Sequence, residues 1–131
     1  MDETDRHILG ILRNDGRSSF VDIAKKVGLT EGAVRARLRK LYEDGTIKRF
    51  TVETKDDVKA VMLVATSRSV STSKVSGEIE ALGVGRVYEI SGNFDIVCFV
   101  ESESIDQVNS IVDKIREIDG VTDTSTSLVL K

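Results

Sequence analysis

The chain has 131 residues, of which 40% are hydrophobic and 31% are charged, and its formal net charge is -3. This composition suits a soluble globular protein of one ordinary domain or two small ones, and the sequence has no bilayer-spanning run and no apolar signal core, so we expect a cytoplasmic protein without membrane contact. A single cysteine, Cys98, and a single histidine, His7, exclude an internal disulfide, a Cys/His metal cluster and a nucleophile-base pair within one subunit, so we predict no enzyme, metal site or cofactor.

Three short helices are predicted in the first part of the chain. Asp5–Arg13 has apolar residues on one side, and Asn14-Asp15-Gly16 ends this first helix. Phe20–Val27 repeats its apolar residues at helical spacing. Gly28 can take the left-handed conformation that ends this second helix, and Thr30 can cap the third. Two helices joined by such a tight turn are typical of a helix-turn-helix, which binds DNA.

The third helix carries most of the residues that we predict to bind double-stranded DNA. Successive residues advance roughly 100° around a helix, so Val34, Leu38 and Leu41 form an inward stripe. Small residues and cations occupy the opposite side and its flanks. Such a face can enter the major groove, which is about 12 Å wide, whereas the charges of an ordinary helix are simply solvated. The predicted contacts on this helix and its N-terminal end are Thr30, Glu31, Gly32, Arg35, Ala36, Arg37, Arg39 and Lys40.

A strand and a linker are predicted after the third helix. Thr46–Val52 alternates enough to form a strand, which would make the domain a winged helix-turn-helix. Lys48 and Arg49 would then lie beside the DNA backbone, although ordinary solubilising charge explains them equally well. We expect a DNA-binding domain at residues 1–52 and a polar linker at residues 53–59.

Charge is divided unevenly between the two parts of the chain. Residues 1–50 have eleven Lys/Arg and eight Asp/Glu, a net charge of +3, whereas residues 51–131 have eight and fourteen, a net charge of -6. Phosphate would repel the acidic part, so we expect this part to point away from the duplex and to have another role.

Residues 60–131 follow the pattern strand, helix, strand, strand, helix, strand. Two right-handed strand-helix-strand crossovers of this size predict an α+β protein whose second domain has a ferredoxin-like βαββαβ fold, with both helices on one face of a four-stranded antiparallel sheet. The predicted elements are the strand Ala60–Thr66, the helix Ser73–Leu82, the strands Arg86–Ser91 and Asp95–Glu101 joined at Gly92-Asn93, the helix Ser104–Ile118 and the strand Thr124–Leu130.

Both faces of the predicted sheet are apolar. Along one strand, Ile96 and Cys98 point one way while Val97 and Phe99 point the other. The two helices can cover only one face, and soluble monomers rarely expose a large apolar patch, so we expect a homodimer in which a second copy covers the other face. A symmetric dimer would set two recognition helices about one duplex turn, roughly 34 Å, or a multiple of it apart, which predicts a near-palindromic DNA site.

A series of motifs extends over nearly the whole chain. In the first half these motifs are Asp5, Ile8-Leu9, Leu12, Arg17, Ile23-Ala24, Val27-Gly28-Leu29-Thr30, Val34, Arg37-Leu38, Leu41, Gly45 and Ile47-Lys48. In the second half they are Ser91-Gly92-Asn93-Phe94-Asp95, Gly120-Val121, Thr124-Ser125-Thr126 and Leu128-Val129-Leu130. Together and in this order they resemble the Lrp/AsnC family, the leucine-responsive or feast/famine regulators. The resemblance implies a transcription regulator whose C-terminal domain binds a small effector, most often an amino acid, between dimers that assemble further into tetramers or octamers.

The resemblance also suggests an effector site near the predicted hairpin. A zwitterion needs N–H donors for its carboxylate and an acceptor for its ammonium. Gly92 and Asn93 offer backbone N–H groups, Asp95 offers a carboxylate, and Thr124 and Thr126 offer hydroxyl groups. An ordinary hairpin turn and plain strand propensity account for the same residues.

The effector chemistry and the class of function each leave a question open. Asp123 together with Asp95 favours a basic amino acid such as lysine or arginine as the effector, and this is a hypothesis about charge alone. The competing function is a small-molecule-binding assembly protein whose helix-turn-helix domain is vestigial or a protein-docking surface. DNA affinity that falls steeply with salt distinguishes a true DNA-binding domain from this alternative.

Overall fold

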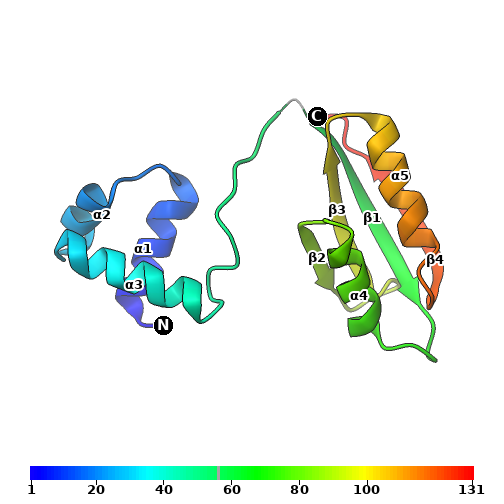
Figure 1. The fold of residues 1–131 in the computed structure, drawn as a ribbon, viewed down its shortest axis with the longest axis horizontal. Coiled ribbons are helices and arrows are strands. Elements are labelled where there is room, and N and C mark those ends of the chain that lie inside the picture. Colours follow the sequence, from blue (N-terminus) through cyan, green and yellow to red (C-terminus); the bar gives the residue numbers. More distant parts are fainter. Residues whose placement is uncertain (56) are drawn as a thin grey trace. The chain divides into compact units, whose positions relative to one another are not determined.

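The computed structural model describes residues 1–55 and 57–131, which form two compact units, Met1–Glu53 and Thr54–Lys131 (Figure 1). Asp56, which the predicted linker includes, lies outside the described residues. Each unit has its own hydrophobic core. Within the described ranges, no helix combines the length and the apolarity that crossing a membrane requires.

The first unit contains the three predicted helices, α1 (Glu3–Asn14), α2 (Phe20–Val27) and α3 (Glu31–Glu43). Each begins at a side-chain cap: Asp2, Ser19 and Thr30 accept hydrogen bonds from the backbone N–H groups of Asp5, Asp22 and Ala33. Gly28 ends α2 in the left-handed region, at φ 71°. The helix-turn-helix prediction is therefore confirmed. The core between the helices is built from Ile8, Ile23, Ala24, Val34 and Leu38.

The winged part of the prediction is wrong. Residues 46–52 form no strand, although the backbone N–H of Ile47 folds back to donate to the carbonyl of Leu41 at 2.8 Å. A strand needs a neighbouring strand for its backbone hydrogen bonds, and the other elements of the first unit are helices. Alternation of side chains was therefore insufficient to form a wing in this single chain.

The second unit has the predicted ferredoxin-like arrangement. Its elements are β1 (Val58–Thr66), α4 (Thr72–Ala81), β2 (Arg86–Glu89), β3 (Ile96–Ser102), α5 (Ile105–Arg116) and β4 (Val121–Leu128). All neighbouring strands pair antiparallel in the order β2-β3-β1-β4. Several bounds differ from the prediction. β1 begins at Val58, within the predicted linker, β4 runs from Val121 to Leu128, and the loop between β2 and β3 is longer than the Gly92-Asn93 turn.

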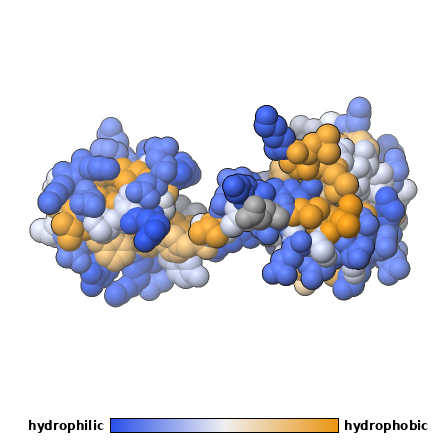
Figure 2. Space-filling view, turned by 90° about the horizontal axis from the view of Figure 1, so that it is seen from above, coloured by the Kyte–Doolittle hydropathy of each residue, from blue (hydrophilic) through white to orange (hydrophobic). Residues whose placement is uncertain are grey.

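The two faces of the sheet have different environments. Alternate residues of β1 and β3, such as Met62, Val64 and Ile96, are fully buried in a core that includes Val75 and Ile79 of α4 and Val108 and Ile115 of α5. Helices α4 and α5 cover this face (Figure 1). Cys98 also lies here, and burial raises the pKa of its thiol to about 11. Hydrophobic side chains also reach the surface of each unit (Figure 2).

The face of the sheet opposite α4 and α5 is called the open face below. It carries the residues that alternate with the core positions of β1 and β3, and these residues are only partly buried. The ring of Tyr88 on β2 meets the ring of Phe99 edge to face at 6.4 Å, and Tyr88 is 51% exposed. The apolar residues of the open face are Val61, Leu63, Tyr88, Val97 and Phe99.

Candidate DNA-binding helix and effector site

Helix α3 separates an apolar spine from an outward face. Val34, Leu38 and Leu41 are buried, at 0%, 6% and 3% exposure. On the other side Gly32, Ala36, Arg39 and Lys40 are all exposed. This distribution matches the predicted one. The two small residues leave the helix backbone open to approach, with cations beside them.

The cations of α3 have different partners. The guanidinium of Arg35 pairs with the carboxylate of Glu31 one turn earlier at 2.6 Å, and it lies 5.3 Å from the centre of the Phe20 ring. The side chains of Arg39 and Lys40 form no hydrogen bond or ion pair with another residue in the described part of the chain, although the charge of Lys40 attracts the carboxylate of Asp44 one turn later. Arg37 differs from these three cations, because it is only partly exposed and its guanidinium is hydrogen-bonded to α1 and its N-cap.

Arg37 joins α3 to the start of α1. Its Nη1 atom donates to Asp2 Oδ2 at 2.7 Å and to Asp5 Oδ1 at 2.9 Å. Asp2 and Asp5 also form a reciprocal capping box, in which each side chain accepts from the other's backbone N–H. The hydrogen bond from Arg37, followed by the one from the Asp5 backbone, lowers the pKa of Asp2 to about 2. We call this group of Asp2, Asp5 and Arg37 the clamp.

The sequence analysis missed the two carboxylates of the clamp. An acidic residue followed three positions later by another, just before an apolar helical pattern, is a capping-box signal that could have identified them. Nothing local connects this signal with Arg37, which is 35 residues from Asp2 and 32 from Asp5. Lys48 and Arg49 are exposed, as predicted, but they lie in the segment that forms no wing.

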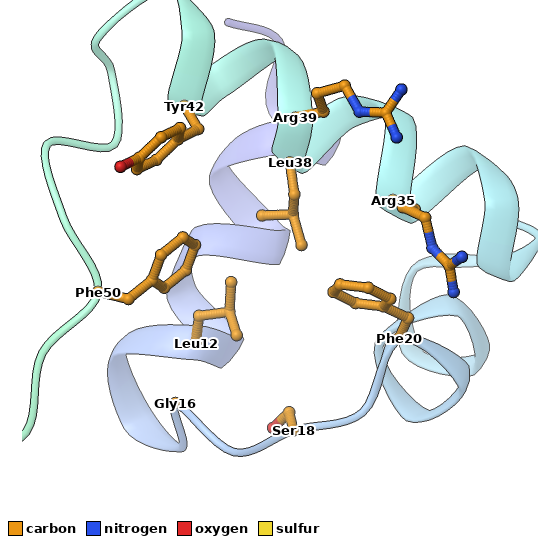
Figure 3. A pocket seen from close by; sticks show the side chains of 9 residues that line it. All are labelled: Leu12, Gly16, Ser18, Phe20, Arg35, Leu38, Arg39, Tyr42 and Phe50. Atoms are coloured by element: carbon orange, nitrogen blue, oxygen red, sulfur yellow. The ribbon is translucent and has the colours of Figure 1, made fainter.

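A pocket of about 350 Å³ lies beside α3 (Figure 3). Leu12 of α1 and Leu38 of α3 point into it from opposite sides, and the rings of Phe20 and Phe50 form two further walls. Tyr42 stacks on Phe50 with ring centroids 6.0 Å apart. The pocket belongs to the first unit, so it does not include the predicted effector residues.

The predicted effector loop lies at the end of the sheet where β1 ends. Gly92 and Asn93 are exposed, and Gly92 has a φ of 135°. Asp95 is partly buried, and its Oδ2 atom accepts hydrogen bonds from the backbone N–H of Thr66 at 2.8 Å and from the Thr66 hydroxyl at 3.2 Å. One oxygen of the predicted ammonium acceptor is therefore used to bind the end of β1.

Thr124 and Thr126 lie on β4, two strands away from Asp95. Ile96, Val64 and Thr124 are in register across β3, β1 and β4. Neighbouring strands are about 4.8 Å apart, so roughly 10 Å separate the backbones of β3 and β4. The Thr124 hydroxyl accepts a hydrogen bond from Arg116 Nε at 3.2 Å, a contact that the sequence analysis did not identify. The structure therefore places the predicted residues in two separate groups, with Gly92, Asn93 and Asp95 at one end of the sheet and the two threonines on β4, where Thr124 is near the same end and Thr126 is opposite Met62 in the middle of β1.

Comparison with known proteins gives the family. Residues 1–42 match the AsnC-type helix-turn-helix domain, and residues 59–131 match the Lrp/AsnC ligand binding domain. The chain belongs to the Lrp/AsnC family. The resemblance inferred from the motifs is confirmed, and this Lrp/AsnC protein is a DNA-binding transcriptional regulator with a ligand-binding domain.

Relatives of this Lrp/AsnC protein align with it along its whole length. It is 38% identical to the HTH-type transcriptional regulator LysM of Sulfurisphaera tokodaii, and the alignment covers 100% of this chain and 96% of LysM. It is 33% identical to the HTH-type transcriptional regulator FL11 of Pyrococcus horikoshii, with 100% and 90% covered.

Solved structures share the fold of this Lrp/AsnC protein. The leucine response regulatory protein of Mycobacterium tuberculosis superposes with a TM-score of 0.77 at 22% identity, covering 100% of this chain and 93% of the other. A transcriptional regulator of Neisseria meningitidis, solved as a complex with L-Met, gives a TM-score of 0.67 at 21% identity, covering 100% and 90%.

Proposed function

We propose that this Lrp/AsnC regulator binds DNA as a homodimer through the outward face of α3, and that an amino-acid effector at the hairpin end of the sheet controls its assembly. The observation that carries the proposal is the outward face itself, where Gly32 and Ala36 are flanked by Arg39 and Lys40 with no ion-pair partner in the described part of the chain. Small side chains allow close approach to the groove, and unpaired cations are available to phosphates and base edges.

Replacing Ala36 by glutamate tests this use of α3. A longer, negatively charged side chain at the centre of the face should clash with the groove and repel phosphate, so DNA affinity should fall by about 100-fold or more, corresponding to roughly 3 kcal/mol. Fluorescence anisotropy on a labelled duplex, selected by the wild-type protein from a random library, measures the change. Ala81→Glu, an exposed alanine of α4, is the matched control. Unchanged affinity of Ala36→Glu would contradict the proposal.

The open face of the sheet supports the homodimer. Its apolar residues are only partly buried in a single chain, and a contiguous apolar patch on a soluble protein is typical of an interface. Arg86 and Glu101 pair at 3.2 Å near Phe99, which gives this apolar region a polar border. Further assembly into tetramers or octamers is the arrangement that the family resemblance suggests.

The separation of the predicted effector residues supports a site shared between copies. Within one chain the Asp95 carboxylate already accepts hydrogen bonds from Thr66, the Thr124 hydroxyl accepts one from Arg116, and their backbones lie roughly 10 Å apart, so the two groups are not presented as a ready pair for one amino-acid head group. We infer that the hairpin of one copy faces β4 of another, so that effector binding favours one assembly over others. The L-Met complex of the Neisseria meningitidis neighbour is consistent with an amino acid as effector.

Calorimetric titration with the twenty amino acids tests the effector site. We expect lysine or arginine to bind most tightly, because Asp95 and the exposed Asp123 add negative charge to this end of the sheet. Thr126→Val should weaken binding about fivefold, the effect of one lost hydrogen bond of roughly 1 kcal/mol. Ser110→Ala, which removes an exposed hydroxyl from α5, is the control. Binding of apolar amino acids alone would contradict the preference for a basic effector.

A further inference from the structure

We propose that Arg37 is a positioning residue, which holds α3 against the start of α1, and that it does not contact DNA. This inference rests on the proposed use of the outward face of α3. It differs from the sequence prediction, which placed Arg37 among the DNA contacts because it lies in the most basic part of the recognition helix.

The first argument is the direction in which Arg37 leaves the helix. Two residues along an α-helix rotate by roughly 200°, so Arg37 and Arg39 cannot both point from the same face. Arg39 is exposed on the outward face, whereas Arg37 is partly buried and directed toward α1. A duplex that approaches Gly32 and Ala36 therefore meets Arg39, whereas Arg37 lies on the flank of the helix, roughly 100° from Ala36, and is turned toward α1.

The second argument is that two carboxylates already occupy the Arg37 guanidinium. Nη1 lies 2.7 Å from Asp2 and 2.9 Å from Asp5, and the Asp5 side chain is only 13% exposed. If Arg37 moved to a phosphate, it would leave Asp5 as a partly buried charge without this partner, which is unfavourable. The clamp has two negative charges and one positive charge, so its net charge of about -1 repels phosphate.

The third argument is what the clamp connects. Asp2 caps α1 and exchanges backbone hydrogen bonds with Asp5, so both carboxylates are held by the start of that helix. Arg37 lies next to Leu38, which anchors α3 in the core. The clamp thus fixes α3 to α1 at a second point beside the apolar spine. The clamp thereby determines the angle at which the outward face meets the duplex. Sequence-specific contacts require this angle, whereas phosphate contacts tolerate some change in it.

Replacing the carboxylates gives the sharpest experiment, because the two possible roles of Arg37 predict different changes in DNA affinity. In Asp2→Asn combined with Asp5→Asn, asparagine remains a good N-cap at position 2 while both clamp charges are lost. If Arg37 contacts DNA, removing two negative charges should leave affinity unchanged or strengthen it. If Arg37 positions α3, affinity for the selected duplex should fall about tenfold while affinity for a scrambled duplex changes little. The single variant Asp2→Asn, at an exposed side chain, provides the same test with less risk to folding.

Salt dependence supplies the second measurement, on Arg37→Gln and on Arg39→Ala, each of which removes one positive charge. The slope of log K against log salt is negative, and losing one phosphate contact reduces its magnitude by about 1. We expect this reduction for Arg39→Ala only. Arg37→Gln should keep the wild-type slope and lose part of the preference for the selected duplex, because the neutral amide removes both ion pairs of the clamp. Thermal unfolding by circular dichroism identifies any variant that is unfolded at the assay temperature.

The outcomes separate the clamp from the proposed function. A wild-type protein that fails to bind any duplex would overturn the use of α3 and would not concern the clamp. Stronger or unchanged binding by a folded asparagine variant, or a salt slope reduced in magnitude for Arg37→Gln, would overturn the positioning role of Arg37 alone. A reduced ratio of selected to scrambled affinity with an unchanged salt slope supports it.

Discussion

Replacing Leu63 by lysine is expected to convert the proposed homodimer into monomers. Leu63 lies on β1, a central strand, between Val97 of β3 and Ser125 of β4 on the open face. In a symmetric dimer the change places two lysines in one apolar interface, so both desolvation and like-charge repulsion oppose association. The dimer dissociation constant should rise at least about 30-fold, as expected for a central residue worth roughly 2 kcal/mol or more. Sedimentation velocity over a concentration series measures it.

The same variant should bind its DNA site much more weakly. Two linked recognition helices gain about 100-fold or more over one, and monomers lose this advantage. Asn109→Lys, at an exposed position of α5, adds the same charge away from the open face and is the control. If Leu63→Lys has the sedimentation coefficient of the wild-type protein at micromolar concentration, the open face is not the dimer interface.

Replacing Gly120 by alanine is expected to destabilise the second unit. Gly120 has a φ of 97°, and a Cβ atom at this position would lie 2.8 Å from Val70 Cβ. Its carbonyl accepts a hydrogen bond from the Ser67 N–H at 2.7 Å, so the turn before β4 cannot easily move away from the loop after β1. Left-handed strain of about 1–2 kcal/mol and overpacking of about 1–3 kcal/mol should together lower the free energy of unfolding by roughly 2–5 kcal/mol.

Gly83→Ala is the matched control for Gly120→Ala. Gly83 has a similar φ of 88°, but an added Cβ would meet no atom within 4 Å. It should therefore show the backbone strain alone, about 1–2 kcal/mol. Urea unfolding followed by circular dichroism compares the two variants. Equal losses of stability would show that the close approach of Gly120 to Val70 contributes nothing.

Local patterns predicted most of the fold correctly. The spacing of Ile23 and Ala24, the left-handed glycine at position 28 and the cap at Thr30 identified α2, its end and the start of α3. These signals depend on contacts between residues three or four positions apart, which a sequence displays directly. The apolar spine of α3 and the strand-helix pattern of the second unit could be predicted for the same reason.

The candidate sites could be predicted only in part. Arg39 and Lys40 lie outward as helical geometry requires, but Arg37 has partners in α1 that no local rule identifies. Asp95 was selected for its carboxylate, and the structure uses one of its oxygens to hold Thr66, 29 residues earlier. The distance between Asp95 and Thr124 depends on β1 lying between their strands, which is a property of the sheet order.

The amino-acid sequence by itself determined the helices, the cap at Thr30, the alternating strands and the division into a basic and an acidic part, because these follow from the chemistry of near neighbours. Only the tertiary structure decided that residues 46–52 form no wing, that Arg37 points to Asp2 and Asp5, and that the predicted effector residues fall into two groups. Each of these depends on which distant segment supplies a backbone partner, an opposite charge or an intervening strand. Such partners are found only when the chain is folded.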